Sequence, residues 1–339
     1  MDARRRLVWF RRLATAGAAL AATVVVLGAW VRLTNAGLGC PDWPGCYGHV
    51  YPNTGLSDAG SSLEFAKALH EMIHRYFASS LGIVILVLAV WALRFRRDRD
   101  QPVLPVVLLL VVVCLQGALG ALTVTLLLRP LIVTAHLLGG LTTLGLLCWL
   151  ALPPGGRLSE RDLALRGFAC VGLGVLILQI ALGGWTSTNY AAVACPDLPT
   201  CQRAWWPAMD FRDAFVLWRG LDIDYEGGVL ANPARTAIHV THRLGAVTAG
   251  LVLGALGILA LAREHSRRVR QAGAWLLLAV LLQIAIGLST VHWGVPLSLA
   301  TLHNAGAALL VVCMVNLLRA LEPARAPDMV PLRRADPPH

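Results

Sequence analysis

Four histidines occupy matching positions in two halves of the chain, each inside a long apolar segment: His74, His136, His242 and His303. Ionisable side chains are costly inside a membrane and usually mark a functional site. Two imidazoles on facing helices can supply both axial ligands of a haem iron. Zinc would need three or four ligands, and no third one recurs in both halves. We therefore expect two haem sites, His74 with His136 and His242 with His303. The alternative is that each histidine only hydrogen-bonds a neighbouring helix.

The two histidine pairs differ in one nearby residue. Glu71 lies three residues before His74, on the same helical face, whereas His239 lies three residues before His242. A carboxyl group beside a haem can move protons, so Glu71 is the candidate catalytic residue. The alternative is a carboxylate satisfied by a neighbouring hydroxyl group or arginine. His70 and His239 are second-choice ligands, because each lies one turn from a preferred histidine.

An arginine directly follows the first histidine of each pair. Arg75 and Arg243 are therefore candidates for binding haem propionates, since a guanidinium group recognises carboxylates well. His49 and His292 lie in predicted loops, and we expect them to be ordinary surface residues.

The elements that must position these residues are membrane-spanning helices. The chain has 339 residues, of which 57% are hydrophobic and only 14% charged, and its mean hydropathy is +0.64. Soluble domains carry about 25% charged residues. A helix needs about 20 apolar residues to cross a bilayer. Eight segments meet this condition: 13–32, 68–93, 103–123, 130–152, 164–186, 236–262, 272–291 and 297–318.

The basic residues report orientation. The net charge is +10, but most of the 29 lysines and arginines cluster at the N-terminus, in alternate turns and after the last helix. This pattern follows the positive-inside rule, with both termini cytoplasmic. We therefore expect a multi-pass membrane protein in contact with lipid and no nucleic-acid binding.

Two short cysteine loops then fall on the outer face. They read GCPDWPGC at 39–46 and CPDLPTC at 195–201. A metal clip, a redox pair and a structural staple are all conceivable, but the spacing is that of neither a zinc site nor a C-x-x-C-H haem attachment. Disulfides persist outside the cytoplasm. We expect structural disulfides Cys40–Cys46 and Cys195–Cys201 covering the haem pockets, with redox-active pairs as the alternative.

The chain is an internal duplication. GAWVRLTNAGLGCPDWPGC at 28–46 aligns without a gap with GGWTSTNYAAVACPDLPTC at 183–201. The histidines and the motifs LQGALG and LQIAIG also repeat in register. We predict an all-α integral membrane protein, with two tandem four-helix bundles related by a pseudo-twofold axis along the membrane normal. The expected divisions are two four-helix repeats, 1–155 and 156–322, each with one histidine pair, and a disordered cytoplasmic tail at 323–339. Residues 202–235 look like an insertion in the second half.

The motifs RLTNAGLGCPDWPGC, EMIHR, TAHLLGG, THRLGA and TLHNAG together resemble the haem A synthase family over roughly residues 12–320. The resemblance implies an oxidase that converts a ring methyl of haem O into the formyl group of haem A for terminal oxidases. It implies a haem b cofactor on His242 and His303, and haem O between His74 and His136, with Glu71 as the functional carboxylate. It also implies a place in the bacterial cytoplasmic (inner) membrane. His239 departs from the pattern, and no role carries over to it.

Two other functions remain open at this stage. A di-haem b-type cytochrome passing electrons between a quinone and an outer partner would also use four histidines, but it would not need Glu71 in one half alone. A haem carrier or exporter would hand haem on unmodified. For a synthase we expect haem O as substrate, with haem O synthase, a quinone or redox-protein electron donor, and a second copy of the chain as further candidate partners.

Overall fold

The computed structural model describes residues 2–50, 62–98, 100–156, 159–262 and 265–323. Within these ranges it is helical throughout, with eight helices long and apolar enough to cross a membrane. These are α1 (Ala3–Leu33), α2 (Ser62–Arg94), α3 (Val103–Thr125), α4 (Pro130–Ala151), α5 (Glu160–Thr188), α7 (Asn232–Ala260), α8 (Arg267–His292) and α9 (Leu297–Ala320). A 3₁₀ turn, η1 (Ala191–Val193), and the short helix α6 (Phe211–Ala214) lie between α5 and α7. The predicted tail beyond residue 323 lies outside the described residues.

Several helices extend past the apolar segments that predicted them. The helix α1 begins ten residues before residue 13, because Asp2 caps it by accepting a hydrogen bond from the backbone N–H of Arg5. Ser159 and Asp162 form a capping box at the start of α5. Hydropathy ends where charged residues begin, whereas a helix ends where its backbone is capped. The sequence therefore places the spans well and their ends poorly.

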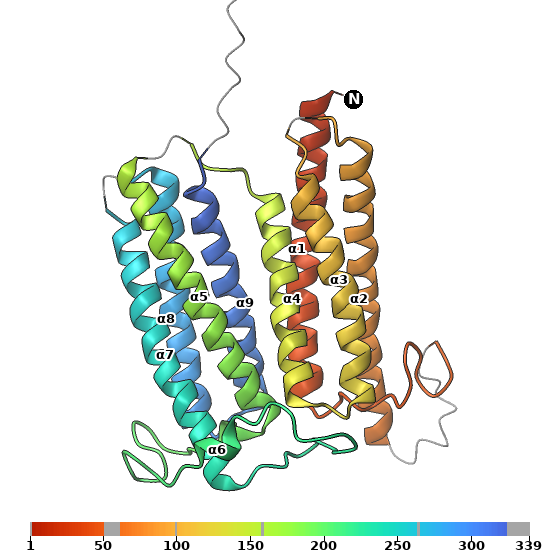
Figure 1. Ribbon diagram of the computed structural model, residues 1–339, viewed down its shortest axis with the longest axis vertical. Coiled ribbons are helices and arrows are strands. Elements are labelled where there is room, and N and C mark those ends of the chain that lie inside the picture. The colour runs from red at the N-terminus through yellow and green to blue at the C-terminus, as the bar shows by residue number, and fades with distance from the viewer. Residues whose placement is uncertain (1, 51–61, 99, 157–158, 263–264, 324–339) are drawn as a thin grey trace, which may run out of the picture.

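The helices form two groups of four with the same internal contacts. In the first group, neighbours in contact are α1–α2, α2–α3, α3–α4 and α4–α1, and the second group repeats this ring with α5, α7, α8 and α9. Between the groups, α4 contacts α9, α1 contacts α9, and α4 contacts α5. Exchanging the two halves turns the α1–α9 contact into the α4–α5 contact and leaves the α4–α9 contact unchanged. Such an interface is consistent with a pseudo-twofold axis passing between α4 and α9 (Figure 1).

The first residues of α1 and the last of α9 lie at the same end of the bundle, and both cysteine loops lie at the other (Figure 1). We call the end with the cysteine loops the disulfide end, and the end with the two chain termini the basic end. The basic end carries arginines such as Arg6, which forms an ion pair with Asp98 at 2.8 Å.

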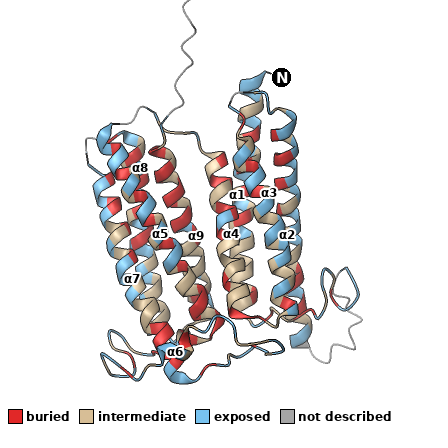
Figure 2. Cartoon of the chain, viewed as in Figure 1, coloured by how far each residue is buried: buried red, intermediate tan, exposed pale blue. Residues whose placement is uncertain are grey.

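Burial follows the helix contacts. Phe10, Leu144, Leu253 and Met314 are almost fully buried between helices, whereas apolar residues on the outer faces of the helices are exposed (Figure 2). Exposed apolar surface on helices of this length is the surface that a bilayer covers. The chain is a multi-pass membrane protein.

The long segment before α7 crosses from the second half to the first. We call residues 202–231 the strap. Its Tyr225 backbone N–H donates to the carbonyl of Leu127, between α3 and α4, at 3.2 Å. Its Glu226 carboxylate lies 3.6 Å from the ammonium group of Lys67, in α2. The strap thus ties the two halves together at the disulfide end, below α4 in Figure 1.

Candidate functional site

The second half holds its two matching histidines against glycines. A Cβ atom placed on Gly183, in α5, would lie 3.2 Å from Cε1 of His242, in α7. A Cβ atom on Gly287, in α8, would lie 3.0 Å from Cε1 of His303, in α9. Any larger residue at either glycine would displace the imidazole ring. These glycines therefore let each ring pack directly against a neighbouring helix backbone.

The two rings face each other at a distance suited to a haem iron. The ring centroids of His242 and His303 lie 6.5 Å apart, with an interplanar angle of 80°. With metal–nitrogen bonds of about 2 Å, two axial imidazoles would have their centroids about 6 Å apart. No three His, Cys, Asp or Glu residues gather in a possible metal site anywhere in the described ranges. This donor set therefore fits the two axial positions of a haem better than a bare metal ion.

Two glutamine amides support these rings. The amide nitrogen of Gln179, in α5, lies 3.1 Å from Nδ1 of His242 and donates to that residue's carbonyl at 3.2 Å. The amide nitrogen of Gln283, in α8, lies 3.3 Å from Nδ1 and 3.4 Å from Nε2 of His303 and donates to that residue's carbonyl at 3.0 Å. Partners of this kind orient a ligating imidazole. Gly306 makes room for the Gln283 side chain, since a Cβ atom there would lie 2.0 Å from Oε1.

The first half repeats the glycine contacts. A Cβ atom on Gly28, in α1, would lie 2.9 Å from Cε1 of His74, and one on Gly120, in α3, would lie 3.5 Å from Cε1 of His136. His74 and His136 lie close enough to interact electrostatically. The buried Nδ1 atoms of both rings have no hydrogen-bond partner among the described residues. The first half therefore also packs two imidazoles against glycines, as the second half does.

Gln179 is a second difference between the two pairs, besides Glu71 and His239. Its counterpart in the duplicated register is Val24, which cannot hydrogen-bond His74 through its side chain. Sequence reasoning missed Gln179, although a lone glutamine in an apolar helix was an available signal. Gln116 and Gln283 appeared only as alignment markers. Gln116 lies against Gly139, where a Cβ atom would come within 1.8 Å of its amide nitrogen.

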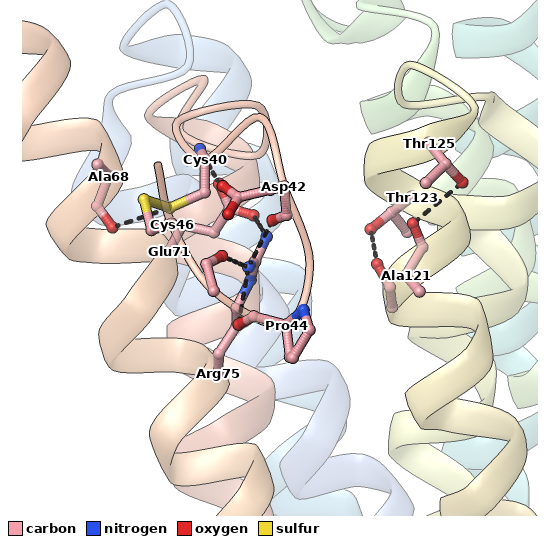
Figure 3. Close-up of polar contacts among 12 residues, drawn as sticks. Cys40, Asp42, Pro44, Cys46, Ala68, Glu71, Arg75, Ala121, Thr123 and Thr125 are labelled. Atoms are coloured by element: carbon pink, nitrogen blue, oxygen red, sulfur yellow. Dashed lines mark hydrogen bonds and ion pairs between the residues drawn. A yellow bond between two sulfur atoms is a disulfide. The ribbon is translucent and has the colours of Figure 1, made fainter. Parts of the chain in front are cut away.

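Glu71 is buried beneath the first cysteine loop. Its Oε2 accepts a hydrogen bond from the backbone N–H of Cys40 at 2.9 Å, and its Oε1 lies 2.5 Å from Nη2 of Arg75 (Figure 3). The carboxylate is thus satisfied by an arginine, which was the alternative considered for it. His239, at the equivalent position in the second half, is also buried, and its Nδ1 has no partner within the described segments.

Both predicted propionate arginines contact the cysteine loops. Arg75 donates from Nη1 to the carbonyls of Asp42 at 3.0 Å and Gly45 at 2.6 Å. Arg243 donates to the carbonyls of Thr200 and Cys195, each at 2.8 Å. The two arginines therefore fix the loops at the disulfide end. Their binding of propionates stays a prediction.

The two cysteine loops have the same structure. Disulfides join Cys40 to Cys46 and Cys195 to Cys201, as predicted from the place of both loops on the outer face. Within each loop an aspartate accepts backbone hydrogen bonds from the two residues that follow the second cysteine. Asp42 accepts from Tyr47 at 2.6 Å, and Asp197 accepts from Gln202 at 2.6 Å. Hydrogen bonds from the Thr200 hydroxyl and from backbone N–H groups hold the pKa of Asp197 below its usual value.

The remaining histidines lie away from the facing pairs. His70 packs edge-on against Trp30 with ring centroids 6.1 Å apart. His292, predicted to lie in a loop, is instead the last residue of α8, and it packs against the neighbouring Trp293 with ring centroids 5.1 Å apart. His49 is exposed in the first cysteine loop. His265 contacts Asp162 at 2.7 Å near the basic end, a contact that sequence reasoning did not anticipate.

The amino-acid sequence of this chain is similar to one protein family and to several named proteins. Residues 11–315 match the model of the COX15-CtaA family, described as cytochrome oxidase assembly protein. The haem A synthase of Shewanella oneidensis is 41% identical over 325 residues, covering 92% of this chain and 96% of that protein. The haem A synthases of Caulobacter sp. strain K31 and Halalkalibacterium halodurans are 28% and 26% identical, covering 90% and 94% of those proteins.

Proposed function

This chain belongs to the COX15-CtaA family of cytochrome oxidase assembly proteins, and from that premise we propose that it acts as a haem A synthase. The reaction oxidises one ring methyl group of haem O to a formyl group. Successive hydroxylations, each consuming dioxygen with two electrons and two protons and releasing water, give a gem-diol, and loss of water from the gem-diol leaves the aldehyde. The chain is thus a membrane-bound oxidoreductase whose substrate is a haem. One observation carries this proposal. The chain has two similar histidine pairs, and only the first has a carboxylate, Glu71, one helical turn from one of its histidines.

The second half is the proposed site of a resident haem b. His242 and His303 would be its axial ligands, and such a haem supplies one-electron transfer when bound. The separation of the two rings and their contacts with Gln179 and Gln283 support this assignment. The chain's own contribution here is to hold both rings in fixed orientations within an apolar bundle.

The first half is the proposed site of haem O. His74 and His136 would bind its iron, and their Nδ1 atoms lack the glutamine contacts seen in the second half. Glu71 is the proposed proton-handling group, because it lies one turn from His74 and forms an ion pair with Arg75. Arg75 holds the carboxylate at this position through their ion pair.

The surroundings complete the proposal. We place the protein in the bacterial cytoplasmic (inner) membrane, with both termini cytoplasmic and the disulfide end outside, because the arginine-rich turns lie at the basic end. A quinone or a redox protein would supply electrons, and haem O synthase would supply the substrate. The division into a substrate half, residues 1–155, and a haem b half, residues 156–322, is part of this proposal.

One assay tests the function. The protein is expressed together with a source of haem O, and the extracted haems are separated by chromatography and identified by mass. A formyl product that depends on the protein supports the synthase. Unchanged haem O beside a bound haem b would instead support an electron-transfer cytochrome or a haem carrier.

A further inference from the structure

Arg129 is a buried arginine whose hydrogen-bonding capacity is only partly used. It directly precedes α4 at the disulfide end, and only 1% of its surface is exposed. Its guanidinium carbon lies 3.6 Å from the ring centroid of Trp218, in the strap, and its Nη2 donates to the carbonyl of Gly220. Its Nε and Nη1 atoms are buried and have no partner among the described residues.

A buried guanidinium group without a counter-charge is costly. Buried charges in proteins are normally paired, and buried N–H groups normally have acceptors. The free Nε–H and Nη1–H groups lie on different edges of the guanidinium, and each can donate a charge-assisted hydrogen bond to a carboxylate oxygen. The unpartnered N–H groups of Arg129 therefore point to an anionic group on a ligand that binds beside this side chain.

The position of Arg129 indicates which ligand that is. Arg129 precedes His136 by seven residues, so the two lie on nearly the same face of the α4 segment and about 10 Å apart along its axis. The separation places the guanidinium group on the side of His136 nearer the disulfide end. In the duplicated register the residue that precedes His303 by seven is Pro296. The second half therefore has no such cation.

We propose that Arg129 binds a propionate group of the substrate haem in the first half, with Trp218 of the strap holding the guanidinium plane in place. The strap belongs to the second half in sequence, yet it would complete the substrate site of the first half. This contact would orient the macrocycle and so select which ring methyl is presented for oxidation. The inference rests on the proposed function, because it requires a haem between His74 and His136.

The test compares two probes that differ only in their propionates. The purified protein, with the haem of its second half in place, is titrated with iron protoporphyrin IX and with its dimethyl ester, and binding of the second haem is followed by absorbance. Charge-assisted hydrogen bonds predict that wild type binds the free acid about ten-fold or more tightly than the ester. Arg129→Met should bind the acid about ten-fold more weakly and lose the preference. Arg129→Lys should retain part of it.

Two further variants make the result specific. Arg219, in the same strap, already pairs with Asp213 at 2.7 Å, so Arg219→Met should keep the wild-type preference. His136→Ala should abolish binding of the second haem, which locates the titrated site. Equal binding of acid and ester by wild type, or an undiminished preference in both Arg129 variants, would overturn the inference while leaving the function intact. A second haem that binds normally to His136→Ala would overturn the proposed substrate site, and the inference with it.

Discussion

The carboxylate of Glu71 accepts a hydrogen bond from the backbone N–H of Cys40 at 2.9 Å. The residue proposed to handle protons is therefore joined directly to the disulfide loop. Arg75 extends the connection, because it contacts both the Glu71 carboxylate and the carbonyls of the loop. The loop and the ion pair form one unit at the disulfide end of α2 (Figure 3), and His74 directly precedes Arg75 in the sequence of that helix. A change at Glu71 can act on the chemistry or on the loop, and experiments must separate the two.

Replacement of Glu71 by glutamine makes this separation. The amide oxygen of Glu71→Gln can still accept from the N–H of Cys40, but the side chain no longer carries a charge or a transferable proton. We expect haem content to stay normal and conversion of haem O to fall by about 100-fold or more, the usual loss on removing a general acid or base. Extracted haems are quantified by chromatography.

The control variant removes a different ion pair of the same helix, one that is not part of the proposed reaction. Lys67→Gln removes the contact with Glu226 of the strap and should leave conversion near wild type. The number of free thiols, measured under denaturing conditions, should be unchanged in both variants. Full activity in Glu71→Gln would remove this residue from the reaction.

The duplicated architecture was predictable from sequence, because a repeat leaves matching residues in register. Apolar segments of about 20 residues located all eight spans. The basic residues in alternate turns indicated the direction in which each span crosses the membrane. The paired cysteines followed from their position in corresponding loops. The path of the strap was not predictable. Its contacts, such as Glu226 with Lys67, join residues that are far apart in the chain and follow no period.

The candidate site was predictable only where it repeats. His242 and His303 emerged because their equivalents recur, and the structure brings them within 6.5 Å. Gln179 and Arg129 occur in one half only, so no repeat drew attention to them. The burial of Arg129 depends on Trp218, almost ninety residues later. The ion pair of Glu71 with Arg75 was considered as an alternative, but the bond to Cys40 depends on how the loop folds back.

The haem of the second half should depend on both facing histidines. In His242→Ala or His303→Ala one axial bond is lost, and we expect the tightly bound haem b spectrum to disappear from the purified protein. Absorbance spectra and the haem-to-protein ratio measure this loss. His292→Ala is the matched control, because that exposed ring packs against Trp293 and its loss should leave the spectrum unchanged. An undiminished spectrum in either ligand variant would reject the assignment.

Gln179 should set the strength and potential of that haem. In Gln179→Val the second half acquires the residue found in the first, and the contact of 3.1 Å with Nδ1 of His242 is lost. Removal of such a supporting contact typically weakens metal binding by about 10- to 100-fold. We expect a lower haem content and a shifted midpoint potential, measured by redox titration. Val24→Gln should strengthen haem binding in the first half, and no effect of either change would show that the glutamine is irrelevant to binding.

The second cysteine loop should become easier to reduce in acid. The pKa of Asp197 is lowered by its hydrogen bonds from the Thr200 hydroxyl and backbone N–H groups. Its ionised form therefore stabilises the folded loop above the ordinary pKa of about 3.8, and this contribution is lost as the pH falls through the lower, folded value. Reduction of Cys195–Cys201 by a phosphine should thus be slow down to about pH 4 and faster below it. Asp197→Asn should be reduced faster at every pH above 4, whereas Asp222→Asn, an exposed strap residue, should behave as wild type. A rate in Asp197→Asn equal to wild type at neutral pH would show that these hydrogen bonds do not hold the loop closed.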